Sequence, residues 1–142
     1  MKTSLDALQI LYITTKNALF YNTSKPNGDI YKQQRPLNSR KEDVVVNGLP
    51  LNRDDIQRGV LNVNIYVPNL RLTVNKVTDN SQPNLIRLKE LADIFNGYFL
   101  NEVWDEHGDY CFKIQQDNIF EDEYNQHYVN FRVEFYSANI NN

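Results

Sequence analysis

The chain has 142 residues, of which 41% are hydrophobic, 12% aromatic and 23% charged. This is ordinary globular composition, and it excludes a wholly disordered or collagen-like chain. With 15 Lys and Arg against 18 Asp and Glu, the net charge is −3. That balance argues against a protein whose main task is to grip nucleic acid, because such domains carry a basic stripe. The length fits one domain, residues 1–142, with a self-sufficient core.

Neither a membrane segment nor a disulfide is expected. No window approaches the roughly 18 uninterrupted apolar residues of a membrane span, and the N-terminus does not resemble a signal peptide. We therefore expect the protein to work where it is made, without a membrane partner. Cys111 is the only cysteine, so an intrachain disulfide and a four-cysteine zinc site are both excluded. A reduced, buried core residue is the expected role of Cys111.

In chain order, the first half predicts one helix followed by three strands. Leu5, Leu8 and Leu11 recur at helical spacing after a possible N-cap at Thr3 or Ser4, which indicates an amphipathic helix to about Thr14. Alternating or β-branched runs bounded by Pro, Asn and Gly then predict strands. These strands cover residues 30–35, 43–47 and 59–68.

The second half predicts a helix and two further strands. Residues 69–84 are a polar connection with an apolar patch, interpreted as a flap or an arm. Apolar residues recurring every three or four positions predict a helix over residues 84–100. Period-2 patterns predict strands over residues 110–115 and 126–136, joined by an acidic connection, residues 117–125.

These elements predict an α+β fold. We expect a two-layer sandwich in which an antiparallel or mixed sheet of four to five strands has two helices packed on one face. Neither a linker nor an internal repeat divides the chain.

The strongest catalytic candidate is the loop that contains Asp105, His107 and Asp109. Carboxylate oxygens and an imidazole suit a divalent cation, so a small metal-dependent enzyme is one alternative. The favoured interpretation is a solvated turn before a strand. No activated nucleophile and no glycine-rich phosphate loop is evident, so we expect neither a cofactor nor catalysis.

Two sets of side chains favour a protein interface. Tyr66, Tyr128, Arg132 and Tyr136 alternate outward from the predicted strands, and Tyr and Arg are enriched at interfaces. An ordinary wet sheet face explains them equally well. The most basic region surrounds residues 32–41; it suits phosphate or an acidic partner, although a solvated surface is the simpler interpretation.

The order of elements resembles that of the tail terminator, or tail completion, proteins of long-tailed bacteriophages and prophages. The resemblance spans most of the chain. Its most telling part is the strand that ends in Ile-Tyr-Val-Pro-Asn at residues 65–69, followed by the helical run at residues 88–95. The final strand, residues 127–135, is similar to the closing strand of that family. The long segment at residues 69–84 departs from the compact family members.

The resemblance implies a non-enzymatic assembly protein of the virion neck, made in the cytoplasm of a bacterial host. Such proteins form a ring, usually hexameric, that caps the tail tube and joins it to the connector or adaptor of the head, while DNA passes through the lumen without specific binding. Another neck or head-tail adaptor protein, or a bacterial binding domain unrelated to phage, are the alternatives. The residues expected at the subunit or tube interface are Tyr31, Arg35, Arg40, Lys41 and Tyr66.

Overall fold

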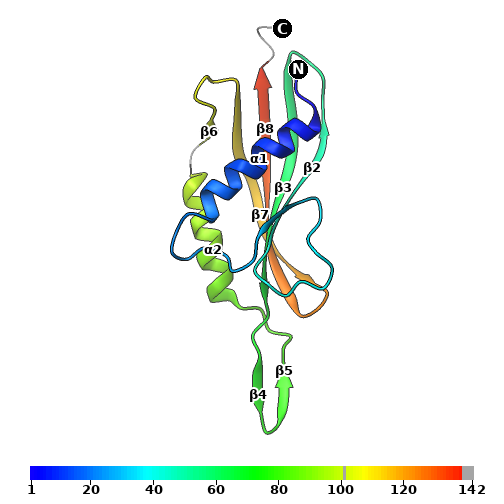
Figure 1. The fold of residues 1–142 in the computed structure, drawn as a ribbon, viewed down its shortest axis with the longest axis vertical. Helices are drawn as coiled ribbons and strands as arrows, with labels where there is room; N and C mark the ends of the chain where they lie inside the picture. Colours follow the sequence, from blue (N-terminus) through cyan, green and yellow to red (C-terminus); the bar gives the residue numbers. More distant parts are fainter. Residues whose placement is uncertain (101, 139–142) are drawn as a thin grey trace.

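The computed structural model describes residues 1–100 and 102–138, which form two helices and eight strands (Figure 1). Six strands make one sheet, and the other two pair only with each other as a hairpin. The elements are α1 (Ser4–Leu19), β1 (Ile30–Lys32), β2 (Val44–Leu51), β3 (Ile56–Pro68), β4 (Leu72–Val74), β5 (Val77–Asp79), α2 (Leu85–Tyr98), β6 (Val103–Trp104), β7 (Tyr110–Asp122) and β8 (Gln126–Ala138).

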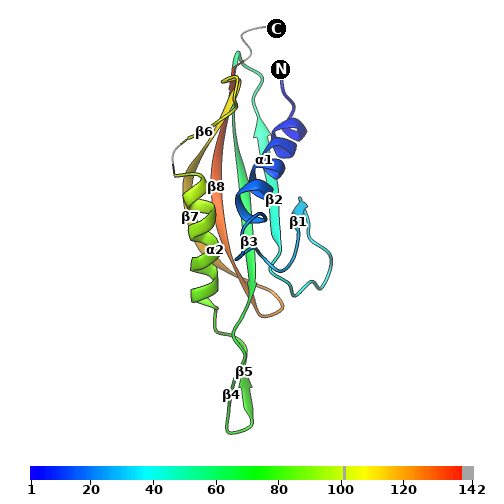
Figure 2. The same ribbon diagram turned by 60° about the vertical axis from the view of Figure 1, so that its left-hand side comes forward.

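The large sheet is mixed, and it is wider than the predicted four to five strands. Its order is β1-β2-β3-β8-β7-β6, with β1 parallel to β2 and all other neighbours antiparallel. The short edge strand β6 accounts for the excess, because a two-residue strand leaves too short an alternation to recognise in a sequence. The α+β class and the placement of both helices on one face are confirmed (Figure 2).

Both helices begin where side chains cap them. The Thr3 hydroxyl accepts the Asp6 amide (3.1 Å) while the Asp6 carboxylate accepts the Thr3 amide (2.7 Å), forming a capping box. Asn84 caps α2 by accepting the Arg87 amide at 3.1 Å. Helix α1 continues past the predicted end because Ala18 and Leu19 lie on the same buried face. Apolar residues in the first turn of each helix, Leu5 and Leu85, are exposed contrary to the predicted pattern.

The core lies between the helices and the two longest central strands. The predicted inward residues of β3 and β8 are all buried. Helix α1 contributes Leu8 and Leu11, and helix α2 contributes Leu91 and Phe95, whose ring lies 4.6 Å from that of Phe131. Cys111 is buried, as expected, with the pKa of its thiol raised by burial. The buried strand residues are Leu61, Val63, Ile65, Val67, Val129, Phe131, Val133 and Phe135.

Several strand boundaries differ from the prediction. Strand β2 continues past Asn47 to Leu51, and β3 begins at Ile56 rather than Gly59. Two other differences have clear backbone reasons. The strand expected to reach Arg35 ends at Lys32, because Gln33 adopts a positive φ of 67° and turns the chain away. The acidic segment expected to be a connection instead prolongs β7 to Asp122. Positive φ values at Tyr124 and Asn125 then return the chain into β8. Charged residues are accepted in this part of β7 because both of its faces are largely exposed.

The β4-β5 hairpin, here called the arm, projects from one end of the elongated molecule (Figures 1 and 2). Asn75 and Lys76 form its turn with φ values of 51° and 65°, the signs that a two-residue type I′ turn requires. The predicted flap or arm is therefore a β-hairpin. The N-terminus and the end of β8 lie at the opposite end of the molecule. Within the described residues, neither helix is long and apolar enough to cross a membrane.

Candidate functional site

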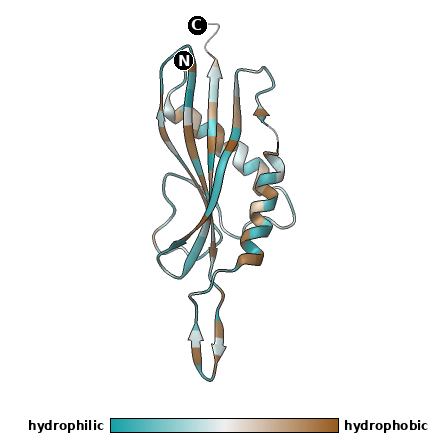
Figure 3. Cartoon of the chain, turned by 180° about the vertical axis from the view of Figure 1, so that it is seen from behind, coloured by the Kyte–Doolittle hydropathy of each residue, from teal (hydrophilic) through white to brown (hydrophobic). Residues whose placement is uncertain are grey.

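The helices leave one face of the six-stranded sheet uncovered, and we call it the open face (Figure 3). Amide side chains line its centre in cross-strand rows. Asn130 donates to Asn64 at 2.7 Å and to Asn62 at 3.2 Å, and Asn62 donates in turn to Asn47 at 2.9 Å. The amide side chains carry no formal charge, but Arg132, which pairs with Asn62 across the strands, places a cation beside them.

An aromatic row crosses the open face beside these amides. Tyr66 on β3 pairs with Tyr128 on β8, which pairs with Phe120 on β7, and successive ring centroids lie 4.9 and 5.5 Å apart. Burial, together with the nearby carboxylate of Asp122, raises the pKa of Tyr66 to about 12. The phenol therefore stays neutral at physiological pH. Aromatic rows of this kind suit protein contacts, since they offer large, rigid surfaces.

The segment from Gln33 to Asp43 folds over one end of this row, and Arg35 holds it there. The Arg35 guanidinium lies 4.3 Å from the Tyr66 ring centroid and pairs with the buried Asp43 carboxylate at 2.9 Å. It also donates to the side chain of Gln126 at 2.9 Å and to two carbonyls of its own loop, those of Ser39 and Lys41, at 3.1 Å. We call residues 33–43 the anchored loop.

The structure brings most of the predicted interface residues together around this loop. Tyr31 lies at its start on β1, half-buried, where burial and then the carboxylates of Asp43 and Asp29 raise its pKa. Arg40 and Lys41 are exposed on the loop; Arg40 donates to the Tyr124 carbonyl at 3.0 Å. Arg35 differs from the others because its side chain is only 12% exposed and its donors are used internally.

A second ion pair fixes the other end of the loop to helix α2. Arg87 donates to both carboxylate oxygens of Glu42, at 2.7 and 2.9 Å, and to the Lys25 carbonyl at 3.0 Å. Although burial raises the pKa of Glu42, the Arg87 hydrogen bonds outweigh it and leave that pKa below its usual value. Gly28 lies against the same loop, since a Cβ there would meet Asp43 Oδ1 at 2.1 Å.

The arm presents a contrasting surface. Every residue of β4 and β5 is exposed, including Leu72, Val74 and Val77. Val74 and Val77 are each 68% exposed, and the two strands hydrogen-bond only to each other within the described part of the chain. A two-stranded hairpin without further support is marginally stable in water. The arm is therefore expected to be only marginally stable while water alone surrounds it.

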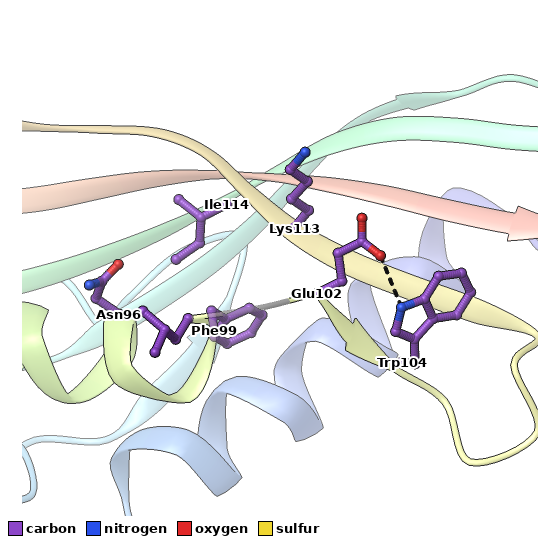
Figure 4. Close-up of a pocket in the computed structure, with 7 residues that line it drawn as sticks. Asn96, Phe99, Glu102, Trp104, Lys113 and Ile114 are labelled. Carbon is purple, nitrogen blue, oxygen red and sulfur yellow. Dashed lines mark hydrogen bonds between the residues drawn. The ribbon is translucent and has the colours of Figure 1, made fainter.

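A groove of about 700 Å³ lies between the C-terminal end of α2, β6 and β7 (Figure 4). Phe99 and Ile114 form its apolar floor, and Trp104 and Glu102 line one side, joined by a hydrogen bond of 3.0 Å from the indole Nε1. Leu100, also in the lining, is 74% exposed. Large apolar side chains exposed beside a groove indicate a place for a macromolecular partner.

The loop of Asp105, His107 and Asp109 is a tight turn between β6 and β7. Asp105 receives the Gly108 amide at 2.9 Å and donates its own amide to the Tyr110 carbonyl at 3.0 Å. Among residues 1–100 and 102–138, no three His, Cys, Asp or Glu side chains gather closely enough to hold a metal ion. The structure therefore gives the metal-enzyme alternative no support.

The sequence prediction missed two features. The sequence predicts a flap or an arm over residues 69–84 but not its two strands, because alternation in 72–79 is only three residues per strand and Asn-Lys is a weaker turn signal than Asn-Gly. The exposed Trp104 and Leu100 stood at the end of a predicted helix and in a loop, where no periodic pattern applies. Exposed tryptophan in a loop is the signal that would have found the groove.

Comparison with known proteins adds no family assignment. No protein-family model matches the sequence, and no curated protein matches it either. The proposals below therefore depend on the geometry of this chain and on the resemblance described above.

Proposed function

We propose that the chain is a non-enzymatic structural subunit that assembles with copies of itself into a ring. On the resemblance of its elements to tail terminator proteins, we propose that this ring caps the tail tube of a long-tailed phage or prophage and joins it to the head. The tail tube protein and a head connector or adaptor would be its other partners.

The arm is the observation that carries this proposal. An element whose side chains are all exposed, apolar ones included, gains stability only when a second molecule covers it. The arm and the groove are different surfaces of one chain, so a contact between them in two copies is heterologous. Repeated by rotation, a heterologous contact closes into a ring.

The charge distribution supports a passage for DNA rather than a grip on it. The net charge is −3, and the cations Arg58 and Arg132 of the open face lie beside the carboxylate of Glu134 and among amides rather than in a continuous basic stripe. A surface that releases few counterions has little affinity for phosphates. If the open face lines the ring, DNA would pass it without being held.

The anchored loop supplies the contacts that the resemblance leads us to expect. Arg40, Lys41 and the half-buried Tyr31 and Tyr66 remain within reach of a neighbouring molecule. Arg35 would act indirectly, because it holds the loop against the sheet. We therefore propose Arg40 and Lys41 as direct contacts and Arg35 as the residue that positions them.

Electron microscopy of the purified chain, alone and added to growing tail tubes of the same phage, tests both parts of the proposal. We expect closed rings, and we expect rings at tube ends together with an arrest of tube elongation. Rings that ignore tube ends would contradict the terminator role but retain the assembly role. Single subunits under both conditions would contradict both.

A further inference from the structure

We propose that the arm of one subunit docks into the α2-β6-β7 groove of a second copy of this chain and lies along the free edge of β7. This inference deepens the proposed self-assembly and rests on it. It names the two surfaces that meet, and it can fail while self-assembly itself stands.

The first argument is the match of apolar surface. Leu72, Val74 and Val77 on the arm are 45%, 68% and 68% exposed. In the groove, Leu100 and Trp104 are 74% and 57% exposed. Both surfaces leave apolar side chains exposed to water, and contact between the two would bury the apolar side chains of each.

The second argument is an unpaired strand edge. β6 covers β7 only at Cys111 and Phe112, so within the described residues β7 has no strand neighbour on that side from Lys113 to Asp122. Exposed edges with free amide and carbonyl groups accept an added strand. Lys113 and Ile114, which line the groove, are the first residues of this free edge (Figure 4).

The third argument is charge complementarity. Residues 69–82, the arm and its flanks, carry Arg71 and Lys76 against the single carboxylate of Asp79. The segment beside the groove, residues 102–109, carries four carboxylates and neither lysine nor arginine, against the single cation of Lys113 in the groove lining. Opposite charges around an apolar contact favour this partner and fix its orientation. Two arms, or two grooves, would repel each other, which disfavours a symmetric dimer through either surface alone.

A charge swap tests the pairing in the full-length chain. Arg71→Glu with Lys76→Glu should raise the concentration needed for half-maximal assembly at least tenfold, and Glu102→Lys with Glu106→Lys should do the same. All four substitutions together should restore assembly to within about threefold of the natural chain. The matched control, Lys25→Glu with Arg53→Glu, reverses two exposed cations outside the arm. Adding the groove substitutions to this control should not restore assembly as they do for the arm variant.

Cross-linking gives a second, independent readout. Burial of Cys111 raises the pKa of its thiol, so the natural chain supplies no competing reactive cysteine. Lys76→Cys combined with Glu102→Cys should produce a ladder of disulfide-linked oligomers on mild oxidation. The control pair, Lys76→Cys with Lys25→Cys, should produce none.

The outcomes separate the inference from the function on which it rests. The arm-groove contact would be overturned, while self-assembly stands, by either of two results. One is normal assembly of the arm variant; the other is a four-substitution variant that assembles less well than the arm variant or the groove variant alone. A natural chain that never assembles would overturn both. Assembly only when the tail tube protein is added, unaffected by the groove substitutions, would assign the arm to that protein and overturn the pairing of two copies.

Discussion

The anchored loop and the arm are both polar connections rich in charge and turn residues, yet the fold treats them in opposite ways. Arg35 ties the loop to the sheet through Tyr66 and Gln126, and the pair of Glu42 and Arg87 ties it to helix α2. The strands of the arm pair only with each other within residues 1–100 and 102–138, and they expose Val74 and Val77. The difference teaches that a cluster of cations does not by itself mark a contact surface. Arg35, a cation of the loop, makes contacts within the subunit that stabilise its fold, whereas the apolar side chains of the arm are exposed.

Removing the Arg35 side chain should show the largest difference between the anchored loop and the arm in their contribution to the free energy of unfolding. Arg35→Ala leaves the Asp43 carboxylate buried without its cation, and we expect a loss of about 3–5 kcal/mol in the free energy of unfolding. Urea denaturation measures it. The control Arg40→Ala removes an exposed cation of the same loop and should cost less than about 1 kcal/mol. Equal losses for the two variants would mean that Arg35 does not anchor the loop.

The second tie makes stability depend on pH. The pKa of Glu42 in the folded chain lies below its unfolded value, so the stability it contributes is complete above that unfolded value, near 4.5, and is lost as the pH falls through the lower folded value. Glu42→Gln should cost about 1.5–3 kcal/mol at pH 7. The same variant should show a shallower loss of stability in acid, measured by urea denaturation from pH 6 to pH 3. An unchanged slope would exclude Glu42 from this role.

A glycine pair tests how closely the loop packs. Gly28→Ala would place a Cβ 2.1 Å from Asp43 Oδ1 and 2.5 Å from the Glu42 carbonyl, and should cost about 1–3 kcal/mol. Gly97→Ala on α2 meets nothing within 4 Å and should stabilise the chain by up to about 1 kcal/mol. Thermal unfolding distinguishes them. Stabilisation by both substitutions would show that the loop is not packed closely against residue 28.

The arm should show the smallest effect on the stability of the subunit. Val74→Asp with Val77→Asp changes exposed side chains and should alter the free energy of unfolding of the monomer by less than about 0.5 kcal/mol per substitution. Urea denaturation at a concentration too low for assembly measures it. A large loss would mean that the arm is part of the folded core, contrary to the comparison drawn here.

The long periodic elements could be predicted from sequence because their burial alternates regularly. The inward residues of β3 and β8 and a cap at Thr3 follow from local rules, and the structure confirms them. Short strands such as β6 carry too few residues for a pattern. The end of β1 depends on the positive φ of Gln33, and a glutamine in the sequence does not predict a positive φ.

The candidate site was predictable only in part for a different reason. Residue type and alternation placed Tyr66 on the open face, and the anchored loop brings Arg35 onto its ring. The internal role of Arg35 depends on Asp43 and on Gln126, which is distant in sequence. A contact between residues 91 positions apart is a property of the tertiary fold.

Light scattering over a concentration series, comparing the natural chain with the Val74→Asp, Val77→Asp variant, tests the central claim most directly. The account predicts that the mass of the natural chain climbs from 16.7 kDa towards a closed ring, while the variant remains near 16.7 kDa at the same concentrations. A natural chain that stays at 16.7 kDa throughout, or a variant that assembles equally well, would contradict it.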